Sequence, residues 1–526
     1  MASSRTRWFG LLFVSLGISL IIVDSTIVNV SIPSIIDDLG ISSTQVQWVQ
    51  ESYTLVFAAL LLVYGALADR FGRRLTLVLG LIVFGIASVL AAFAPTGDLL
   101  IFSRVLQGLG GAMVLPTTLS LVNANFQGKE RGIAFAVWGS TIGGMVAVGP
   151  LLGGWLTTDF SWRWAFGINI PLVVIIVIGA LLTIPESKEA VARRIDWLSA
   201  FFSVIAMAAL VFGLIEGRTY GWWLVNKPFA IGDWTWPFEV SVIPFLFLIF
   251  ALATFAFIAY GRAREKAGKS TLINFSLFRI SSFTNGNVAA AVISMGEFGI
   301  ILSLPLWLQF VIGYNALQTG LILLALAIGA FVASGIAGGL NGRVTPVTMV
   351  RLGIVLEIIG VAGLGFSINA NSSWLTITPW LFSYGLGVGL ATAQLTNVIL
   401  LDVPVAQSGQ ASGTQSTSRQ LGSALGIAVL GTILFASIQG VLTASLTEEK
   451  LPAAQVEQIV AAVVDSSGAA IQGLEQDPAT IPIADKAKDA FSTATSVSAY
   501  SAAGFLALGF VATLSLGGKR REGSAK

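Results

Sequence analysis

The chain alternates between long apolar runs and short polar segments that hold most of its charges. An α-helix rises ~1.5 Å per residue and needs about 20 apolar residues to cross a bilayer, which these runs supply. No segment shows the ~10-residue alternation of polar and apolar positions that is typical of membrane β-barrels. The pattern predicts an all-α membrane protein with fourteen transmembrane helices, at about residues 9–32, 47–67, 75–94, 98–120, 133–156, 164–184, 197–215, 238–260, 284–311, 316–340, 346–367, 375–401, 411–438 and 496–516.

The charged segments between these runs predict how the chain is oriented. The segment from Gly65 to Leu75 carries one Asp and three Arg, so it is expected at the membrane surface rather than in hydrocarbon. Basic residues gather there and in the other segments on the same side of the predicted helices, including Arg5, Arg7 and residues 262–269. Because Lys and Arg favour cytoplasmic loops, we expect a multi-pass protein of the cell membrane with both termini in the cytoplasm.

Two segments expected on the opposite side have unusual compositions. Residues 216–237 include four Trp residues, which fits an aromatic belt at the membrane interface or, as the alternative, a dedicated binding surface. Residues 440–495 are acidic and rich in Ala, and part of this stretch has a helical period. A small extracellular cap and a disordered loop are both compatible with this composition.

Composition restricts the chemistry that the chain can perform. Only 11% of the 526 residues are charged and the net charge is +2, which argues against a nucleic-acid partner. There is no Cys and no His, so proton exchange near neutral pH has to rely on carboxylates. The sequence also lacks the G-x-x-x-x-G-K-[ST] pattern of nucleotide-binding loops. We therefore expect no metal, no cofactor and no drive by ATP; a proton gradient as the driving force is what the resemblance described below implies.

An internal repeat with an offset of 273 residues predicts how the helices are grouped. The matched positions are Gly65, Leu67, Arg70 and Gly80 in the first copy and Gly338, Leu340, Arg343 and Gly353 in the second. Transporters are often built from such repeats, with the substrate site between them. We expect a six-helix half over residues 1–190, two inserted helices over 191–265, and a second six-helix half over 266–526.

Several short motifs in the chain resemble those of a known family. The segment from Gly65 to Leu75 resembles motif A of the major facilitator superfamily, Ser103–Gly111 resembles its motif B, and Gly139–Trp155 resembles its antiporter motif C. Their combination is similar to the fourteen-helix drug:proton antiporter branch, which contains the QacA-type multidrug exporters. The resemblance implies the major facilitator fold and export of small molecules. It also implies a gating role for Gly65, Asp69, Arg70, Gly72, Arg73, Arg74 and Arg131, and a packing role for Gly143, Gly149, Pro150, Gly153 and Gly154.

Charged residues inside the apolar runs are the candidates for proton coupling. Asp24 lies within the first run, where a carboxylate is costly and is by default a functional hypothesis. Arg104 lies at a comparable depth in the fourth run, so the two side chains could meet. A substrate or a conformational change that separated them would then release or capture a proton. The alternative is a static pair that holds the first and fourth helices together. The repeat carries Asp24 onto Glu297, and Glu51 is placed near the outer mouth.

A central cavity between the halves is expected to bind the substrate. Asp24 and Glu297 would face it and attract cations, and aromatic side chains would favour lipophilic ones. The remaining candidates for its lining are Tyr53, Trp138, Trp307, Gln309, Phe310, Gln394 and Asn397.

Taken together, these patterns predict a proton-coupled secondary antiporter. Its substrates would be amphipathic, cationic drugs or dyes, moved by alternating access, and the protein would act as a monomer among membrane lipids. The nearest alternative is an exporter of a dedicated lipid, metabolite or natural product on the same scaffold. An enzyme is not expected, because no catalytic cluster occurs in the sequence. A sensor that binds its ligand without transport is a further alternative.

Overall fold

The computed structural model describes residues 4–41, 43–188, 195–231, 234–340 and 343–516, which are almost entirely helical. The helices are α1 (Ser4–Leu39), α2 (Ser43–Phe71), α3 (Arg73–Ala92), α4 (Gly97–Asn125), α5 (Gly128–Asp159), α6 (Trp164–Gly167), α7 (Asn169–Thr183), α8 (Trp197–Tyr220), α9 (Val242–Lys266), α10 (Ser281–Phe310), α11 (Ala316–Leu340), α12 (Pro346–Ser367), α13 (Trp374–Ile399), α14 (Ser408–Glu448), α15 (Ala453–Asp465), α16 (Ala470–Leu474) and α17 (Ile481–Thr513). Two 3₁₀ helices, η1 (Phe275–Arg279) and η2 (Val405–Gln407), precede α10 and α14. Strands β1 (Ala230–Ile231) and β2 (Trp234–Thr235) pair in a two-stranded antiparallel sheet.

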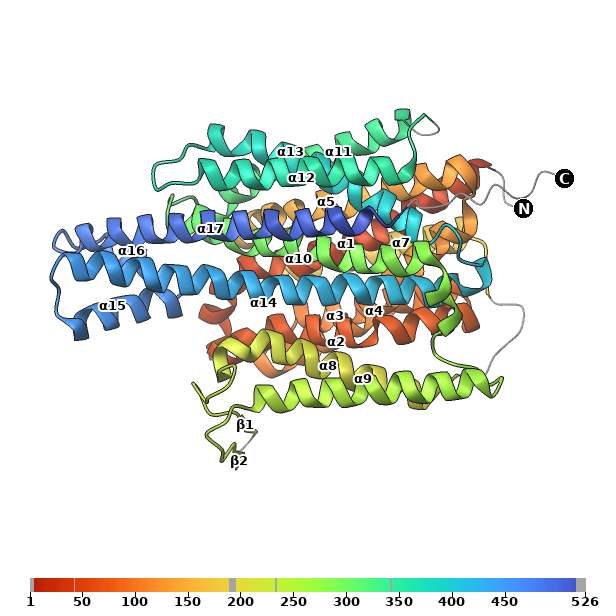
Figure 1. The fold of residues 1–526 in the computed structure, drawn as a ribbon, viewed down its shortest axis with the longest axis horizontal. Coiled ribbons are helices and arrows are strands. Elements are labelled where there is room, and N and C mark those ends of the chain that lie inside the picture. Colours follow the sequence, from red (N-terminus) through yellow and green to blue (C-terminus); the bar gives the residue numbers. More distant parts are fainter. Residues whose placement is uncertain (1–3, 42, 189–194, 232–233, 341–342, 517–526) are drawn as a thin grey trace.

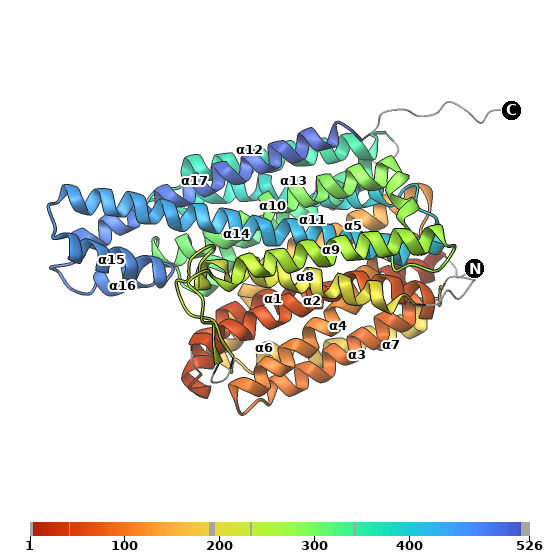
Figure 2. The same ribbon diagram turned by 60° about the horizontal axis from the view of Figure 1, so that its bottom comes forward.

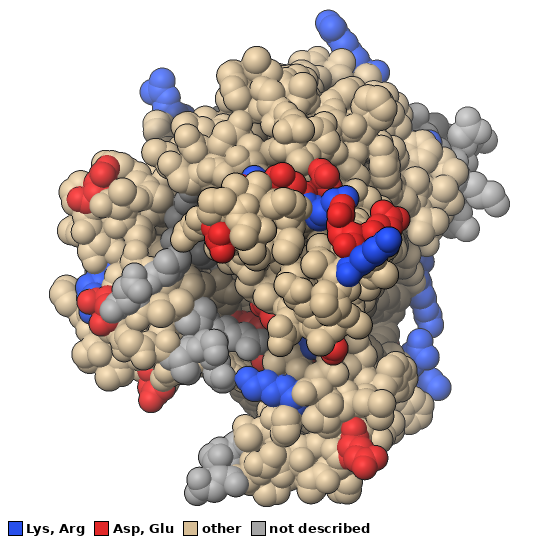
Figure 3. Space-filling model, turned by 90° about the vertical axis from the view of Figure 1, so that its left-hand side faces the viewer, with Lys and Arg blue, Asp and Glu red and all other residues tan. Residues whose placement is uncertain are grey.

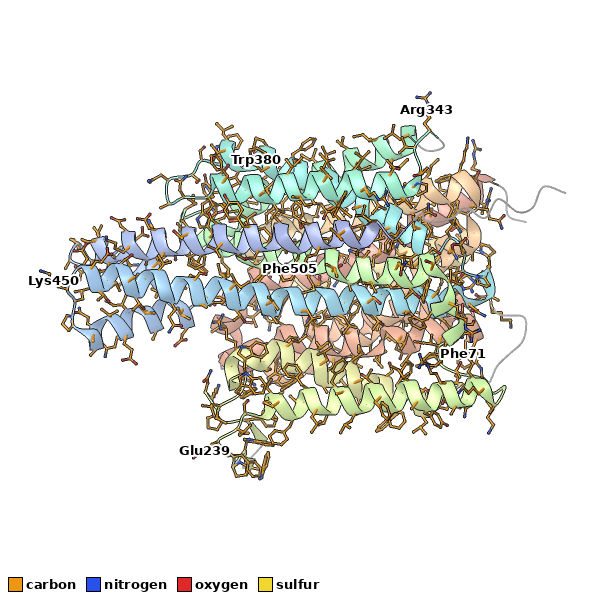
Figure 4. The ribbon with its side chains drawn as sticks, in the orientation of Figure 1. Phe71, Glu239, Arg343, Trp380, Lys450 and Phe505 are labelled. Atoms are coloured by element: carbon orange, nitrogen blue, oxygen red, sulfur yellow. The ribbon has the colours of Figure 1, made fainter. Side chains whose placement is uncertain are left out.

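The long helices run side by side in one elongated bundle (Figure 1). We call the end at which α1 begins and α17 ends the terminal end, and the opposite end the distal end. In Figure 4, Phe71 and Arg343 lie toward the terminal end, and Lys450 lies at the far distal tip. The connecting segments that hold these charged residues therefore lie at the two ends of the bundle, as expected for a membrane protein.

Twelve stretches among the described residues are long and apolar enough to cross a membrane. They comprise α1 to α4, the joined α6 and α7, α8 to α12, α14 with η2, and α17. Helices α5 and α13, of 32 and 26 residues, lie within the bundle but outside this set. The predicted all-α membrane fold is confirmed, whereas the count of fourteen spans stays a prediction.

The helices pack as two groups with a helix pair at their seam. Helices α1 to α7 form the first group, and α10 to α14 with α17 form the second. The groups meet where α5 packs against α11 and α13, and where α14 packs against α2 and α4. Helix α8 contacts both α2 and α14, and α9 packs mainly on α8 (Figure 2). The pair α8–α9 therefore lies along one side of the seam between the groups.

Glycines allow close helix crossings at equivalent places in the two groups. A Cβ at Gly110 of α4 would lie 2.7 Å from the backbone oxygen of Gly80 in α3. A Cβ at Gly387 of α13 would lie 2.6 Å from the backbone oxygen of Gly353 in α12. Because Gly80 and Gly353 are related by the 273-residue offset, the two crossings are built in the same way.

Residues 440–495 are folded, and we call them the distal cap. Helix α14 continues to Glu448, α15 and α16 follow, and α17 begins at Ile481, so both long helices extend beyond the rest of the bundle (Figure 1). Val456, Val460 and Val463 are buried on one face of α15, at the spacing of an amphipathic helix. The two alternatives for this segment were a small cap and a disordered loop, and the structure has the ordered cap.

The Trp-rich segment packs partly on the helix pair α8–α9. The ring of Trp222 stacks on that of Phe247 with 6.4 Å between centroids, whereas Trp223 is 76% exposed. The choice between an aromatic belt and a binding surface stays open, because exposed Trp side chains suit both.

Candidate functional site

Asp24 is completely buried and accepts hydrogen bonds from three side chains. Its Oδ2 lies 2.6 Å from Nη1 of Arg104, and its Oδ1 accepts from the amides of Gln107 at 3.0 Å and Asn169 at 2.8 Å. The residues come from α1, α4 and α7. A buried ion pair is tolerated when further hydrogen bonds satisfy its charges. The structure therefore brings Asp24 and Arg104 together in a fully bonded cluster.

Arg104 connects this cluster to a cavity of about 300 Å³ on the distal side. Its Nε donates to the backbone oxygen of Val49 at 3.0 Å, and its guanidinium lies 4.3 Å from the ring centroid of Tyr53. A cation over an aromatic face is stabilised by the ring quadrupole. The cavity lies between α1, α2, α4 and α8 on one side and α14 on the other. Figure 3 shows the molecule from its distal end. Its lining consists of Ser25, Val28, Gln50, Glu51, Tyr53, Thr54, Arg104, Val211, Leu214, Ile215, Gln420, Ser423, Ala424 and Ile427.

At the terminal end, Asp69 joins α2 to the beginning of α14. Its two carboxylate oxygens accept from the backbone N–H groups of Gly409 at 2.7 Å and Gln410 at 2.9 Å. These N–H groups belong to the first turn of α14, where the helix dipole favours a negative charge. Arg73 Nη2 lies 2.6 Å from Asp69 and also donates to the backbone oxygen of Val405 at 2.7 Å. We call this set of contacts the terminal closure.

A second row of hydrogen bonds also belongs to the terminal closure. Asn123 of α4 donates to the hydroxyl of Ser408 at 2.8 Å. Arg131 Nε of α5 donates to the side-chain oxygen of Asn397 at 3.0 Å, and Gln394 donates to a backbone oxygen of α5 at 3.4 Å. Because these bonds join the two helix groups, the seam is closed at the terminal end and the cavity lies on its distal side.

Gly65 lets α2 and α14 approach closely beside the terminal closure. A Cβ at this position would lie 2.5 Å from the backbone oxygen of Gly409 and 2.7 Å from Cα of Gly413. Any larger residue would push the two helices apart at the point where Asp69 reaches α14.

The other residues of the charged turn act locally. Gly72 has φ +123°, a conformation that favours glycine. The carboxylate of Glu186 accepts from the backbone N–H groups of Arg74 and Leu75, each at 3.0 Å, and so caps α3. The guanidinium of Arg70 lies 5.3 Å from the centroid of the neighbouring Phe ring. None of these contacts reaches the second helix group.

Glu297 lies in the second group with a separate set of partners. Its Oε2 is 3.3 Å from Arg419 Nη2, and its Oε1 accepts from the hydroxyl of Thr392 at 3.1 Å. Tyr384 donates to the backbone oxygen of Glu297 at 3.0 Å. Glu297, Thr392 and Arg419 border a space of only about 10 Å³, room for roughly one water.

The prediction of one cavity faced by both Asp24 and Glu297 is not what the structure shows. Asp24 is enclosed by its partners, and Glu297 borders the small space in the other group. Glu51 and Tyr53 do line the distal cavity. The sequence could not separate the two sites, because helices that are buried on several sides lack a clear apolar face.

Most of the other predicted lining residues have structural contacts instead. The indoles of Trp138 and Trp307 are buried and donate to hydroxyls of α4 and α17, at 3.1 and 3.0 Å. Gln309 accepts at its backbone oxygen from Gln472 of the distal cap, and Phe310 also lies against the cap. Gln394 and Asn397 belong to the terminal closure. Of the nine predicted substrate-binding residues, Tyr53 is the one that lines the distal cavity.

The predicted antiporter motif packs α5 against its neighbours. A Cβ at Gly149 would overlap a side chain of α1, and one at Gly153 would lie 2.8 Å from a backbone oxygen of the same helix. Gly154 faces α11, and Pro150 lies inside α5. Gly143 also falls within α5. Small residues allow such close helix contacts in membranes.

Sequence reasoning missed four residues that complete these sites. Gln107 and Asn169 bind Asp24, and Ser88 accepts from both of their amides, at 3.0 and 3.2 Å. Gln107 lies within the segment Ser103–Gly111 that resembles motif B, which was a usable signal. Ser88 and the capping residue Glu186 had no signal, since each is an ordinary polar residue far from its partners in sequence.

Comparisons with known proteins agree with this architecture. The family model described as Major Facilitator Superfamily matches residues 14–427. A Streptomyces coelicolor protein named probable actinorhodin transporter is 33% identical over 438 residues, which cover 81% of this chain and 72% of the relative. The multidrug efflux pump LfrA of Mycolicibacterium smegmatis is 30% identical over 500 residues, covering 94% and 93%. The structure of the proton:xylose symporter XylE has the same fold, with a TM-score of 0.60 at 13% identity, covering 97% of this chain and 95% of that one.

Proposed function

This chain belongs to the Major Facilitator Superfamily, and we propose that it exports amphipathic, cationic drugs or dyes across the cell membrane in exchange for protons. Membership of this family makes it a transporter rather than an enzyme. Relatives named as multidrug efflux or resistance proteins support export of drugs. In this proposal the protein works as a monomer among membrane lipids, and the proton gradient drives it without a cofactor.

The observation that carries the proposal is the double role of Arg104. The same guanidinium holds the buried carboxylate of Asp24 at 2.6 Å and lines the distal cavity. Protonation of Asp24 removes the charge that holds Arg104, and a cation entering the cavity changes the field at the same place. Substrate and proton therefore compete through one side chain, which is the requirement for exchange.

The two ends of the seam support alternating access. The terminal closure joins the helix groups at one end, while the cavity lies between them at the other. The distribution of basic residues supports a cytoplasmic terminal end. In this orientation the structure is the outward-facing state, and opening of the terminal closure produces the inward-facing state.

We further propose that α5 and α13 cross the membrane together with the twelve apolar stretches. Both have the length to do so, and both pack between other long helices. The total is then fourteen, divided as six in each group and the pair α8–α9. This count fits the resemblance to the QacA-type drug:proton antiporter branch.

A second candidate is export of one dedicated natural product. It is favoured by a specific observation, the 33% identity to a relative named as a probable actinorhodin transporter. The two candidates differ in substrate range, because a dedicated exporter discriminates against cations that are unrelated to its substrate.

Transport by the purified protein in liposomes tests the proposal. An imposed pH gradient is followed with a pH-sensitive dye while ethidium, a lipophilic cation, is added. The matched pair of variants is Asp24→Asn and Asp38→Asn. Both lie on α1, but Asp38 is half exposed and pairs with Arg163 at the distal end.

Collapse of the gradient that depends on ethidium, lost in Asp24→Asn and kept in Asp38→Asn, would support exchange through Asp24. Collapse that persists in Asp24→Asn would refute its coupling role. If no lipophilic cation collapses the gradient, the dedicated exporter becomes the better reading, and neutral and anionic compounds are tried next.

A further inference from the structure

Glu357 is a buried carboxyl that none of the contacts described so far explains. It lies in the middle of α12, has 0% exposure, and neither of its carboxyl oxygens has a hydrogen-bond partner within the described part of the chain. Asp24 and Glu297 are buried too, but each of them pairs with an arginine. An ionised carboxylate without a partner is unfavourable in such a place, whereas the protonated form is neutral.

The close crossing of α12 and α13 explains why Glu357 is dry. A Cβ at Gly387 of α13 would lie 2.5 Å from both the backbone nitrogen and Cγ of Glu357. On the next turn, a Cβ at Gly360 would lie 2.5 Å from the backbone nitrogen of Tyr384. The two backbones are thus in contact on both sides of the carboxyl, and they exclude solvent from it.

The charged and titratable groups that act on Glu357 come from three helices. They are the carboxylate of Glu297 on α10, the guanidinium of Arg419 on α14 and the phenol of Tyr384 on α13. From α17, which also packs on α12, Tyr500 lies against Gly365, two turns away. Arg419 is 3.3 Å from Glu297. This region therefore holds two carboxyls, Glu297 and Glu357, and one arginine, which pairs with Glu297.

The equivalent position in the first helix group shows that packing does not require an acid here. The 273-residue offset carries Phe84 of α3 onto Glu357. Phe84 is fully buried, and a Cβ at Gly110 would lie 2.8 Å from its backbone nitrogen, matching the contact between Gly387 and Glu357. A hydrocarbon side chain fills the site in one half, and a carboxyl fills it in the other.

We propose that Glu357 is a proton-binding site, which carries a proton in the outward-facing state and forms one exchange unit with Glu297 and Arg419. The proposal rests on the proton antiport proposed above and adds a second proton route to it. In the outward-facing state the unit holds one proton for its two carboxyls, and Arg419 balances the remaining charge. When the terminal end opens, water reaches Glu297. The carboxyl O–H bond of Glu357 breaks, its proton passes to the carboxylate of Glu297, and Glu297 releases it to water on the cytoplasmic side.

Polar side chains mark the path from this unit to the terminal end. Gln415 borders the small space beside Glu297 and donates to Thr396 at 2.9 Å. Asn397, the next residue along α13, receives the hydrogen bond from Arg131 in the terminal closure. Breaking the closure therefore opens a polar route toward Glu297, the member of the unit that borders this space.

Infrared spectroscopy of the purified protein tests the protonation directly and does not depend on transport. A protonated carboxyl gives a C=O stretching band apart from the amide bands, and deuterium exchange shifts it. We expect this band in the wild type at neutral pH, and we expect Glu357→Gln to lose intensity equal to one carboxyl. Glu457→Gln, a change of an exposed acid in α15, should leave the band unchanged. Equal band intensity in the wild type and in Glu357→Gln would overturn the proposal.

Transport stoichiometry tests the coupling role. Protons exchanged per ethidium are measured in liposomes for the wild type, Glu357→Gln and Glu357→Leu, where Leu imitates the hydrocarbon at Phe84 and guards against misfolding. We expect the ratio to fall by one proton in both variants, with ethidium binding retained. An unchanged ratio would overturn the exchange unit. If ethidium moves no protons even in the wild type, the proposed antiport fails, and the infrared band still decides whether Glu357 holds a proton.

Discussion

Replacing Asp69 by Asn should shift the protein from the state with a closed terminal end toward one in which this end is open. Asp69 accepts four hydrogen bonds, two from Arg73 and two that cross to the first turn of α14. Hydrogen bonds to a charged group contribute about 1.5–3 kcal/mol each, and a partly buried charge at a helix N-terminus up to about 2 kcal/mol. Asn keeps one oxygen acceptor but loses the charge and one crossing bond. The closed terminal end should therefore lose about 3 kcal/mol, a shift of roughly 100-fold between the two states.

Distances between spin labels across the terminal end measure this shift. The chain has no native Cys, so labels attach only at the two introduced positions, Gln127→Cys in the first helix group and Ala406→Cys in the second. We expect one short distance in the parent and an added longer one in Asp69→Asn. Glu457→Gln is the control, since this exposed acid lies on α15 in the distal cap, away from the terminal end. Identical distance distributions in Asp69→Asn and the parent would refute the reasoning.

Three further predictions concern packing, pH and charge geometry. Gly149→Ala places a Cβ on α1 and should destabilise the fold by about 1–3 kcal/mol, seen as a lower melting temperature, whereas Gly335→Ala meets no atom within 4 Å and should leave it unchanged. Hydrogen bonding by Arg163 is the main cause that lowers the pKa of Asp38 in the folded protein from its ordinary value of 3.8. The pair therefore stabilises the fold above pH 3.8, and this stability is lost as the pH falls through the lower pKa of the folded protein. The melting temperatures of the wild type and Asp38→Asn should converge at acid pH. Arg104→Lys keeps the charge but not the planar fork, and should cut ethidium-dependent proton flux in liposomes by about tenfold or more; flux within twofold of the wild type would contradict this.

The helices and the buried acid could be predicted because each follows from local sequence. Long apolar runs specify membrane helices whatever they pack against, so α1 to α4 were expected close to where they occur. An acid inside such a run is conspicuous, which singled out Asp24. The charged turn at Asp69 was also conspicuous, since charges between two apolar runs have to lie at the membrane surface.

The orientation of side chains around each helix could not be predicted, because it depends on packing between distant segments. Trp307 was expected in a cavity, but it faces α17, nearly two hundred residues further along the chain. The solvent exclusion at Glu357 likewise depends on Gly387, a residue of the neighbouring helix. A run that is apolar all round carries no period from which either contact could be read.

The location of the two ion pairs constrains how exchange can work. Asp24 and Arg104 lie on α1 and α4 of one helix group, and Glu297 and Arg419 lie on α10 and α14 of the other. If each group moves as a rigid body, neither pair is pulled apart, in contrast to the expectation that a conformational change separates Asp24 from Arg104. The bonds that must break are those of the terminal closure, because they join α2, α4 and α5 to α13 and α14. In the proposed exchange, what then changes at each carboxyl is its access to water, which acts on protonation without any change in the distance to the arginine.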